Sequence, residues 1–240
     1  TQNRRACKSK GERVIKEKFQ EERDLSAKPI VAKTENQKLF LKGCATKSIV
    51  VGKGSAGTGK SFLAACVAAN KLLKGEIDQI VLARPYVPMG RTTGFWPGTA
   101  DEKLTPFLAP LLNILKDRLG TAHFNNLYGT SIKIQPMEAL RGMSFDNTLL
   151  IVDESQNTTK EEIRCIVTRI AEGSQFILIG DDKQSDLRAE DSGISYLVNL
   201  IEKHNIEDTA VIEFTSEDIV RHGLVAQFVK IFEEEGSLRK

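Results

Sequence analysis

The 240-residue sequence has only four cysteines, and no two of them are spaced as a C-x-x-C pair. This argues against a zinc site or a disulfide framework, so we expect free thiols in a reducing, cytoplasmic setting. Cys66 and Cys165 fall within apolar helical patterns and are expected to be buried. No apolar run is long enough to cross a bilayer, so we expect no membrane partner.

The sequence also lacks a clear excess of charge of either sign. It has 34 Lys and Arg and 32 Asp and Glu, which gives a formal net charge of +2. This balance neither requires nor excludes a nucleic-acid partner, which would have to bind a local patch. Residues 4–13 form one basic candidate, and a solvated helix or linker is favoured over a binding arm. We interpret residues 1–28 as a charged N-terminal extension and residues 29–240 as one domain.

A glycine-rich segment at residues 54–61 (GSAGTGKS) matches the pattern G-x-x-x-x-G-K-[ST]. A short apolar strand is expected before it, at residues 48–52, and an alanine-rich helix after it. In this context backbone N–H groups and a helix N-terminus surround a phosphate. Lys60 is placed to neutralise the β- and γ-phosphates, and the Ser61 hydroxyl to bind Mg²⁺. The expected nucleotide-binding residues of the loop are Gly54, Ser55, Ala56, Gly57, Thr58, Gly59, Lys60 and Ser61.

Apolar runs and helical patterns alternate along the rest of the chain. Uninterrupted apolar strands separated by helices predict an α/β fold, in which a parallel sheet is covered on both faces. Further strands are expected at residues 79–83, 131–135, 147–152, 174–180 and 209–214. Helices are expected from Thr34 or Asn36 to Lys42 with Gly43 as the stop, at residues 102–119, 160–171 and 194–204, and from Ser216 to about Glu235.

Two carboxylates, Asp153 and Glu154, directly follow the buried strand at residues 147–152. They therefore lie at the C-terminal edge of the sheet, where doubly wound sheets bind ligands. Asp153 suits Mg²⁺, directly or through water, and Glu154 suits a general base that activates water against the γ-phosphate. The pair favours hydrolysis over phosphoryl transfer to a small molecule. At another strand end, Asp181 and Gln184 are expected beside the same site, where Gln184 can contact the γ-phosphate or its attacking water.

An arginine is also needed, because charge builds up on the transferring phosphoryl group. The residues themselves do not choose among the candidates, which are Arg84, Arg141, Arg164, Arg169 and Arg221. Trp96 lies in a loop with neighbouring aromatics, which suits either the stacking of a nucleobase or packing onto its own domain. The three histidines lack ligand-like spacing, which argues against a metal triad.

Taken in order, these segments resemble the PhoH family, ATPases related to the nucleotide-binding half of superfamily 1 helicases. The match runs from about Gln37 to Phe232. Its blocks are residues 54–61, 84–85, 94–98 with Lys103 and Pro106, 141–142, 152–159, 180–181 with Gln184, 214–216 and 220–222. The sequence departs from the family pattern at Ser155, Ser61 and Trp96, which replace the commoner alanine, threonine and aliphatic residue.

The resemblance implies a three-layer P-loop NTPase with a RecA-like core, Mg²⁺-dependent ATP hydrolysis, and an association with RNA or single-stranded nucleic acid. It implies that Gln37 reads the adenine edge, that Arg221 is aimed at the γ-phosphate, and that Arg84 belongs to the nucleotide site. The expected strand order is 209–214, 48–53, 175–180, 148–152, 79–83. Because superfamily 1 helicases use two RecA-like domains and this chain has room for one, we expect a homo-oligomeric ring, by analogy a hexamer.

Two other function classes stay open. A P-loop small-molecule kinase would use the same loop, but such kinases usually carry an arginine-rich lid and lack the paired acids. A nucleotide-gated binding module would hold ATP, change shape and hydrolyse slowly. Stimulation of ATPase activity by nucleic acid separates the gated module from a helicase-like motor.

Overall fold

The computed structural model describes residues 28–85, 100–188, 191–220, 223–224, 227–228 and 231. The predictions for residues 1–27, for Trp96 and for Arg221 lie outside these residues. Within the described part of the chain, no helix is long and apolar enough to span a membrane.

In the described residues, six parallel strands form one sheet in the order β3-β2-β4-β5-β1-β6. This confirms the predicted order of five strands and adds β3 at the edge beside β2. Every residue of β4 and β5 is buried, because both strands lie inside the sheet with helices over each face. The strands are β1 (Ile49–Gly54), β2 (Gln79–Arg84), β3 (Ile132–Pro136), β4 (Thr148–Val152), β5 (Gln175–Gly180) and β6 (Thr209–Phe214).

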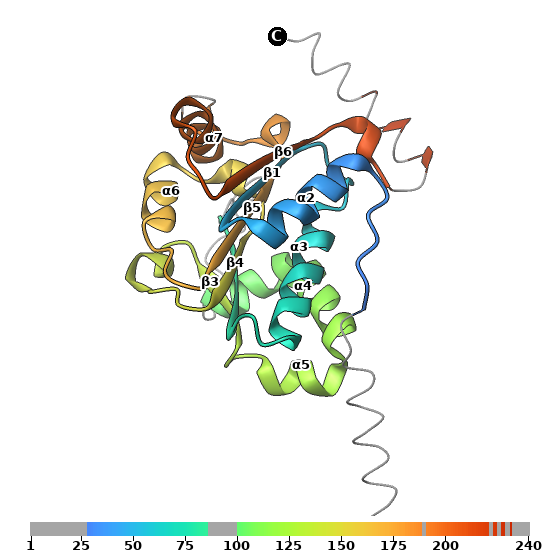
Figure 1. Ribbon diagram of the computed structural model, residues 1–240, viewed down its shortest axis with the longest axis vertical. Helices are drawn as coiled ribbons and strands as arrows, with labels where there is room; N and C mark the ends of the chain where they lie inside the picture. Colours follow the sequence, from blue (N-terminus) through green and yellow to red (C-terminus); the bar gives the residue numbers. More distant parts are fainter. Residues whose placement is uncertain are drawn as a thin grey trace, which may run out of the picture.

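The helices form a layer on each side of the sheet (Figure 1). Helices α2 (Glu35–Thr46), α3 (Lys60–Leu73), α4 (Ala100–Leu119) and α5 (Thr121–Leu127) lie on one side, and α6 (Lys160–Val167) and α7 (Gly193–His204) lie on the other. Each layer has its own apolar core against one face of the sheet, and α3 supplies a run of small buried residues, Ala64–Ala69. The three-layer α/β prediction is therefore confirmed.

Two predicted helix boundaries on the α2 side of the sheet are wrong, the end of one helix and the start of another. Thr34 caps α2 as expected, but the helix continues through Gly43 to Thr46. A Cβ on Gly43 would lie 3.2 Å from the Cβ of Ala210, so this glycine lets the helix approach the sheet rather than ending it. The predicted helix start at Ser216 is a short 3₁₀ turn instead. The Asp218 carboxylate ties that turn to the Thr215 amide and to Asn36 of α2.

Helix α6 also differs from its prediction, because it ends at Val167 and not at residue 171. The following segment leaves the helix, and Ile170 forms a β-bridge with Phe145 beside the sheet. Cys66 is buried as predicted, whereas Cys165 is only partly buried. Helix α6 buries the face that carries Ile163 and Ile166, and Cys165 lies off that face.

Gly54, the first residue of the phosphate loop, has a backbone conformation that excludes a side chain. Its φ is +113°, and a Cβ there would lie 1.9 Å from the carbonyl oxygen of Phe214 on β6. We expect Gly54→Ala to lower the free energy of unfolding by about 3 kcal/mol in urea titrations, through strain and steric overlap. Gly142→Ala is the control, because a Cβ there meets nothing within 4 Å. Equal denaturation midpoints for the two variants would contradict this account.

Candidate nucleotide-binding site

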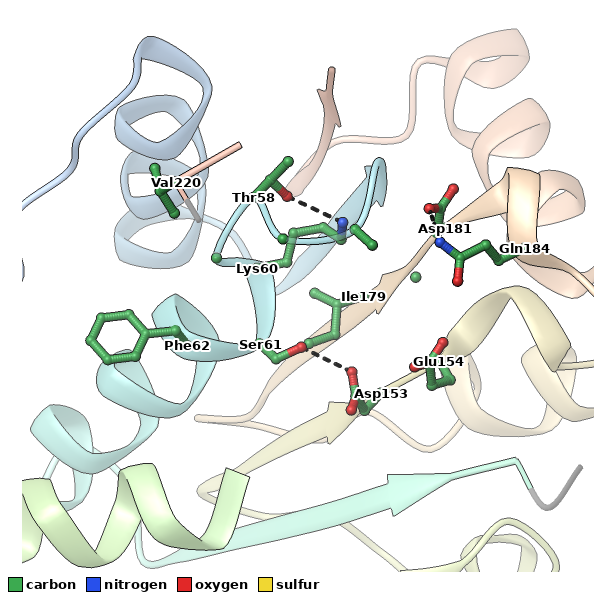
Figure 2. A pocket seen from close by; sticks show the side chains of 14 residues that line it. Thr58, Lys60, Ser61, Phe62, Asp153, Glu154, Ile179, Asp181, Gln184 and Val220 are labelled. Atoms are coloured by element: carbon green, nitrogen blue, oxygen red, sulfur yellow. Dashed lines mark hydrogen bonds between the residues drawn. The ribbon is translucent and has the colours of Figure 1, made fainter. Parts of the chain in front are cut away.

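The loop between β1 and α3 forms the floor of a cavity of about 340 Å³ at the C-terminal edge of the sheet. The parallel strands bring the ends of β4 and β5 to the same edge, so residues far apart in sequence meet there. Figure 2 shows Lys60 near the centre, with Asp153, Glu154, Asp181 and Gln184 on one side. The structure thus places the predicted loop, the acid pair and Gln184 around one cavity.

Lys60 lies at the N-terminus of α3, and its ammonium group is held by the loop itself. Its Nζ donates to the carbonyl oxygen of Ser55 at 2.7 Å and to Oγ1 of Thr58 at 3.2 Å, and also contacts the Gly54 carbonyl. Burial lowers the pKa of Lys60, and the carboxylates of the site, with that of Asp181 the strongest, act in the opposite direction. A phosphate entering the loop offers this buried cation a charged partner in place of neutral oxygens.

The Ser61 hydroxyl on α3 and the Asp153 carboxylate after β4 are in direct contact at the wall of the cavity. Ser61 Oγ donates to Asp153 Oδ1 at 3.1 Å (Figure 2). Burial and the adjacent Glu154 carboxylate raise the pKa of Asp153, and a bound cation would favour the ionised form. A hydroxyl and a carboxylate oxygen are ligands that suit Mg²⁺, which takes its remaining ligands from phosphate and water. No cluster of three or more His, Cys, Asp or Glu able to hold a metal occurs among the described residues.

Glu154 is held on both carboxylate oxygens. Oε2 accepts a hydrogen bond of 2.6 Å from the Gln156 amide, and Oε1 lies 3.7 Å from Nη2 of Arg84. The backbone of Glu154 has φ +52°, a left-handed conformation that is uncommon for a residue with a side chain and clusters at functional sites. Gln156 also accepts from the Asp181 amide at 3.1 Å, so it joins the ends of β4 and β5. Gln156 has no predicted role of its own, although it follows the acid pair closely in the sequence.

Arg84 and Gln184 reach the site from two other strand ends. Arg84, the last residue of β2, binds the carbonyl of Phe107 at 3.3 Å and approaches the site through Glu154. Gln184 lines the cavity, and its amide donates to Asp181 Oδ2 at 2.9 Å. The predicted role of Gln184 at the γ-phosphate stays a prediction.

Gln37 of α2 is buried beneath the loop, with only 3% of its surface exposed. Its amide nitrogen donates to the Thr58 carbonyl at 2.9 Å, and its Oε1 accepts from the Lys33 amide at 2.7 Å. These bonds fasten the phosphate loop to α2 and to the segment before it. Each amide atom of Gln37 retains one further hydrogen-bonding position, and the predicted contact with an adenine edge stays a prediction.

Three other candidate arginines, Arg141, Arg164 and Arg169, lie on the α6 side of the sheet. Arg141 is exposed in a 3₁₀ turn, and Arg169 is exposed in the segment after α6. Arg164 donates to the Tyr196 hydroxyl at 3.1 Å and stacks on that ring. Among the four candidate arginines that the structure describes, Arg84 is the one that contacts the acid pair, through Glu154.

Three apolar residues without a predicted role at the site also line the cavity. Ile179 of β5 is buried, whereas Phe62, in the first turn of α3, and Val220, which follows the 3₁₀ turn after β6, are exposed. The position of Phe62 could have been predicted from the sequence, because a large aromatic residue directly after Lys60 and Ser61 must lie close to the phosphate loop.

The parallel sheet, the loop between β1 and α3, and the acids at the end of β4 define a P-loop nucleotide-binding fold. The chain belongs to the PhoH family, whose model, described as PhoH-like protein, matches residues 29–233. The sequence resemblance is thereby confirmed.

Two curated relatives illustrate the membership. The PhoH-like protein of Bacillus subtilis (strain 168) is 35% identical over 215 residues, which cover 89% of this chain and 67% of the relative. That of Mycobacterium tuberculosis (strain ATCC 25618 / H37Rv) is 37% identical over 215 residues, which cover 88% of this chain and 60% of the relative. The chain therefore spans about two thirds or less of their length.

Among solved structures, the large terminase of the bacteriophage HK97 is similar in fold. It matches 87% of this chain and 50% of its own chain, with a TM-score of 0.52 and 11% sequence identity. At this identity the likeness concerns the fold alone.

Proposed function

We propose that this chain binds ATP with Mg²⁺ and hydrolyses its terminal phosphate, and that hydrolysis is coupled to binding of RNA or single-stranded nucleic acid. One observation carries the hydrolysis proposal. Lys60 and Ser61 from the start of α3, and Asp153 and Glu154 from the end of β4, surround a single cavity. These groups supply a phosphate-binding cation, ligands for a metal and a general base.

The chemistry assigns one task to each group. The Lys60 ammonium exchanges loop carbonyls for phosphate oxygens, while Ser61 and Asp153 would hold the Mg²⁺ that neutralises the developing charge. The Glu154 carboxylate accepts a proton from water as the water oxygen bonds to the γ-phosphorus. The bond from the γ-phosphorus to the oxygen of the departing diphosphate then breaks, which gives ADP and inorganic phosphate.

A nucleotide-gated binding module is the second candidate, and one observation favours it. Both oxygens of Glu154 have a partner, Gln156 on one and Arg84 on the other, so the orientation of the base depends on these two neighbours. In such a module, binding of a partner and not ATP alone would set the hydrolysis rate. A small-molecule kinase receives less support, because the acid pair lies in the nucleotide cavity.

The test is ATP turnover by the purified chain, with and without single-stranded RNA or DNA and with Mg²⁺ or EDTA. We expect turnover that requires Mg²⁺ and increases several-fold with nucleic acid. Slow turnover with no stimulation would favour the gated module, and phosphorylation of an added acceptor would favour a kinase. No turnover under any condition would overturn the hydrolysis proposal.

We further propose that the active form is a cytoplasmic homo-oligomeric ring, by analogy a hexamer, with Arg221 directed at the γ-phosphate of a neighbouring subunit. The support is the resemblance together with the presence of one RecA-like sheet in the described residues. Light scattering on the samples used for turnover measures the mass in solution. A monomer both with and without ATP would contradict the ring and the role of Arg221.

A further inference from the structure

We infer that Phe62 and Val220 form the base-binding end of the nucleotide site, and that the Phe62 ring packs against the purine. This rests on the proposed function, since it names where the nucleoside part of the bound ATP lies. The cavity has two chemically different ends. Charged and polar groups line one side, and Phe62 and Val220 lie on the other side of the phosphate loop (Figure 2).

The position of Phe62 on α3 explains why its side chain reaches the cavity. The next residue, Leu63, is buried against the sheet with 2% exposure, whereas Phe62 points off that face and keeps 49% of its surface exposed. An aromatic ring that lines the cavity and is half exposed has free surface against which a ligand can pack.

The Phe62 ring has support from its own domain. The Arg118 guanidinium carbon lies 5.9 Å from the ring centroid, and Arg118 itself is 8% exposed. Nη1 of Arg118 donates to the Lys28 carbonyl at 2.6 Å, which holds the guanidinium in place. The ring therefore rests on an ordered cation, and a base can pack against it with little further ordering.

Val220 is attached directly to the phosphate loop. Its backbone amide donates to the Gly57 carbonyl at 3.2 Å, and its side chain is 36% exposed. Its Cγ2 lies 3.8 Å from the position that a Cβ on Gly59 would take. An apolar side chain is thus held beside the loop at the end of the cavity that Phe62 occupies.

The direction of the bound nucleotide follows from these two ends. Lys60, Asp153, Glu154 and Gln184 need the γ-phosphate near them, so the α-phosphate and ribose must extend the other way across the loop. The apolar base then arrives between Phe62 and Val220. Stacking on an aromatic ring accepts any base, because every base has a π-face. Phe62 should therefore strengthen binding of ATP and GTP by similar factors.

The experiment compares ATP, GTP and inorganic triphosphate, all with Mg²⁺, by calorimetry on the full chain. We expect Phe62→Ala to weaken ATP and GTP about tenfold and to leave triphosphate affinity unchanged. Phe62→Tyr should retain the affinity of the unsubstituted chain for all three. The control is Ile206→Ala, since Ile206 is similarly exposed (44%) but precedes β6 at the opposite edge of the sheet.

Equal loss of ATP and triphosphate would overturn the inference, because Phe62 would then act through the phosphate loop. Unchanged ATP affinity in Phe62→Ala would overturn it as well. If the unsubstituted chain binds ATP but does not hydrolyse it, the hydrolysis proposal fails while these affinities still decide the role of Phe62. Absence of ATP binding by the unsubstituted chain would overturn both proposals.

Discussion

Glu154→Gln is expected to stop ATP hydrolysis while ATP binding remains intact. Glutamine has almost the same shape as glutamate, but its amide does not take a proton from water at neutral pH. Loss of a general base costs about 10²–10⁴-fold in rate. The substituted side chain can still accept from Gln156 through its amide oxygen, which preserves the link at the end of β4. The measurements are single-turnover phosphate release and the dissociation constant of ATP.

Glu207→Gln is the matched control for this variant, since Glu207 is exposed just before β6, at the opposite edge of the sheet. It should retain the hydrolysis rate of the unsubstituted chain. Hydrolysis by Glu154→Gln within a factor of two of that rate would exclude Glu154 as the base. Loss of ATP binding in the same variant would instead show that the carboxylate is needed to form the site.

Lys60→Ala is expected to abolish turnover and to weaken ATP binding about 100-fold or more, because the variant loses charge-assisted hydrogen bonds to the phosphates. In the structure, Lys60 is the cation held inside the loop, with oxygens of Ser55 and Thr58 as partners. Among the described residues that line the cavity, Lys60 is the one basic side chain, so the variant leaves none there. The measurement is the rise in melting temperature on adding ATP with Mg²⁺, which should disappear in the variant.

Lys53→Ala serves as the control for charge, because Lys53 lies on β1 close to the loop but pairs with Glu213 at 3.4 Å. This variant should keep the rise in melting temperature that ATP produces. A rise of equal size in Lys60→Ala would show that the nucleotide does not contact this lysine. The P-loop assignment of the cavity would then be wrong.

The features that the sequence predicted correctly depend on local order along the chain. The phosphate loop is contiguous, so its glycines, Lys60 and Ser61 identify it without reference to any distant residue. The acid pair also follows its strand directly, and β4 and β5 are apolar throughout because both faces are covered. For this reason the α/β class and the convergence of these segments at one edge of the sheet could be predicted.

The errors and omissions involve contacts between segments that are distant in sequence. Gly43 resembled a helix stop, but its missing side chain makes room for Ala210 of β6. Ser216 resembled the start of a long helix, yet Asp218 binds back to Asn36 on α2. In both cases a tertiary contact outweighed the local preference of the residue.

The sequence alone determined that this chain has a phosphate loop, a following acid pair and a parallel sheet that brings them together, since short-range order and apolar runs encode all three. Only the tertiary structure decided what surrounds these groups. It placed Arg84 and Gln156 on the two oxygens of Glu154, Gln37 beneath the loop, and Phe62 and Val220 on the side of the loop away from the acids (Figure 2). The physical reason is that side-chain partners are chosen by distance and orientation in space, and these exist only once the strands are paired and the helices are packed against them.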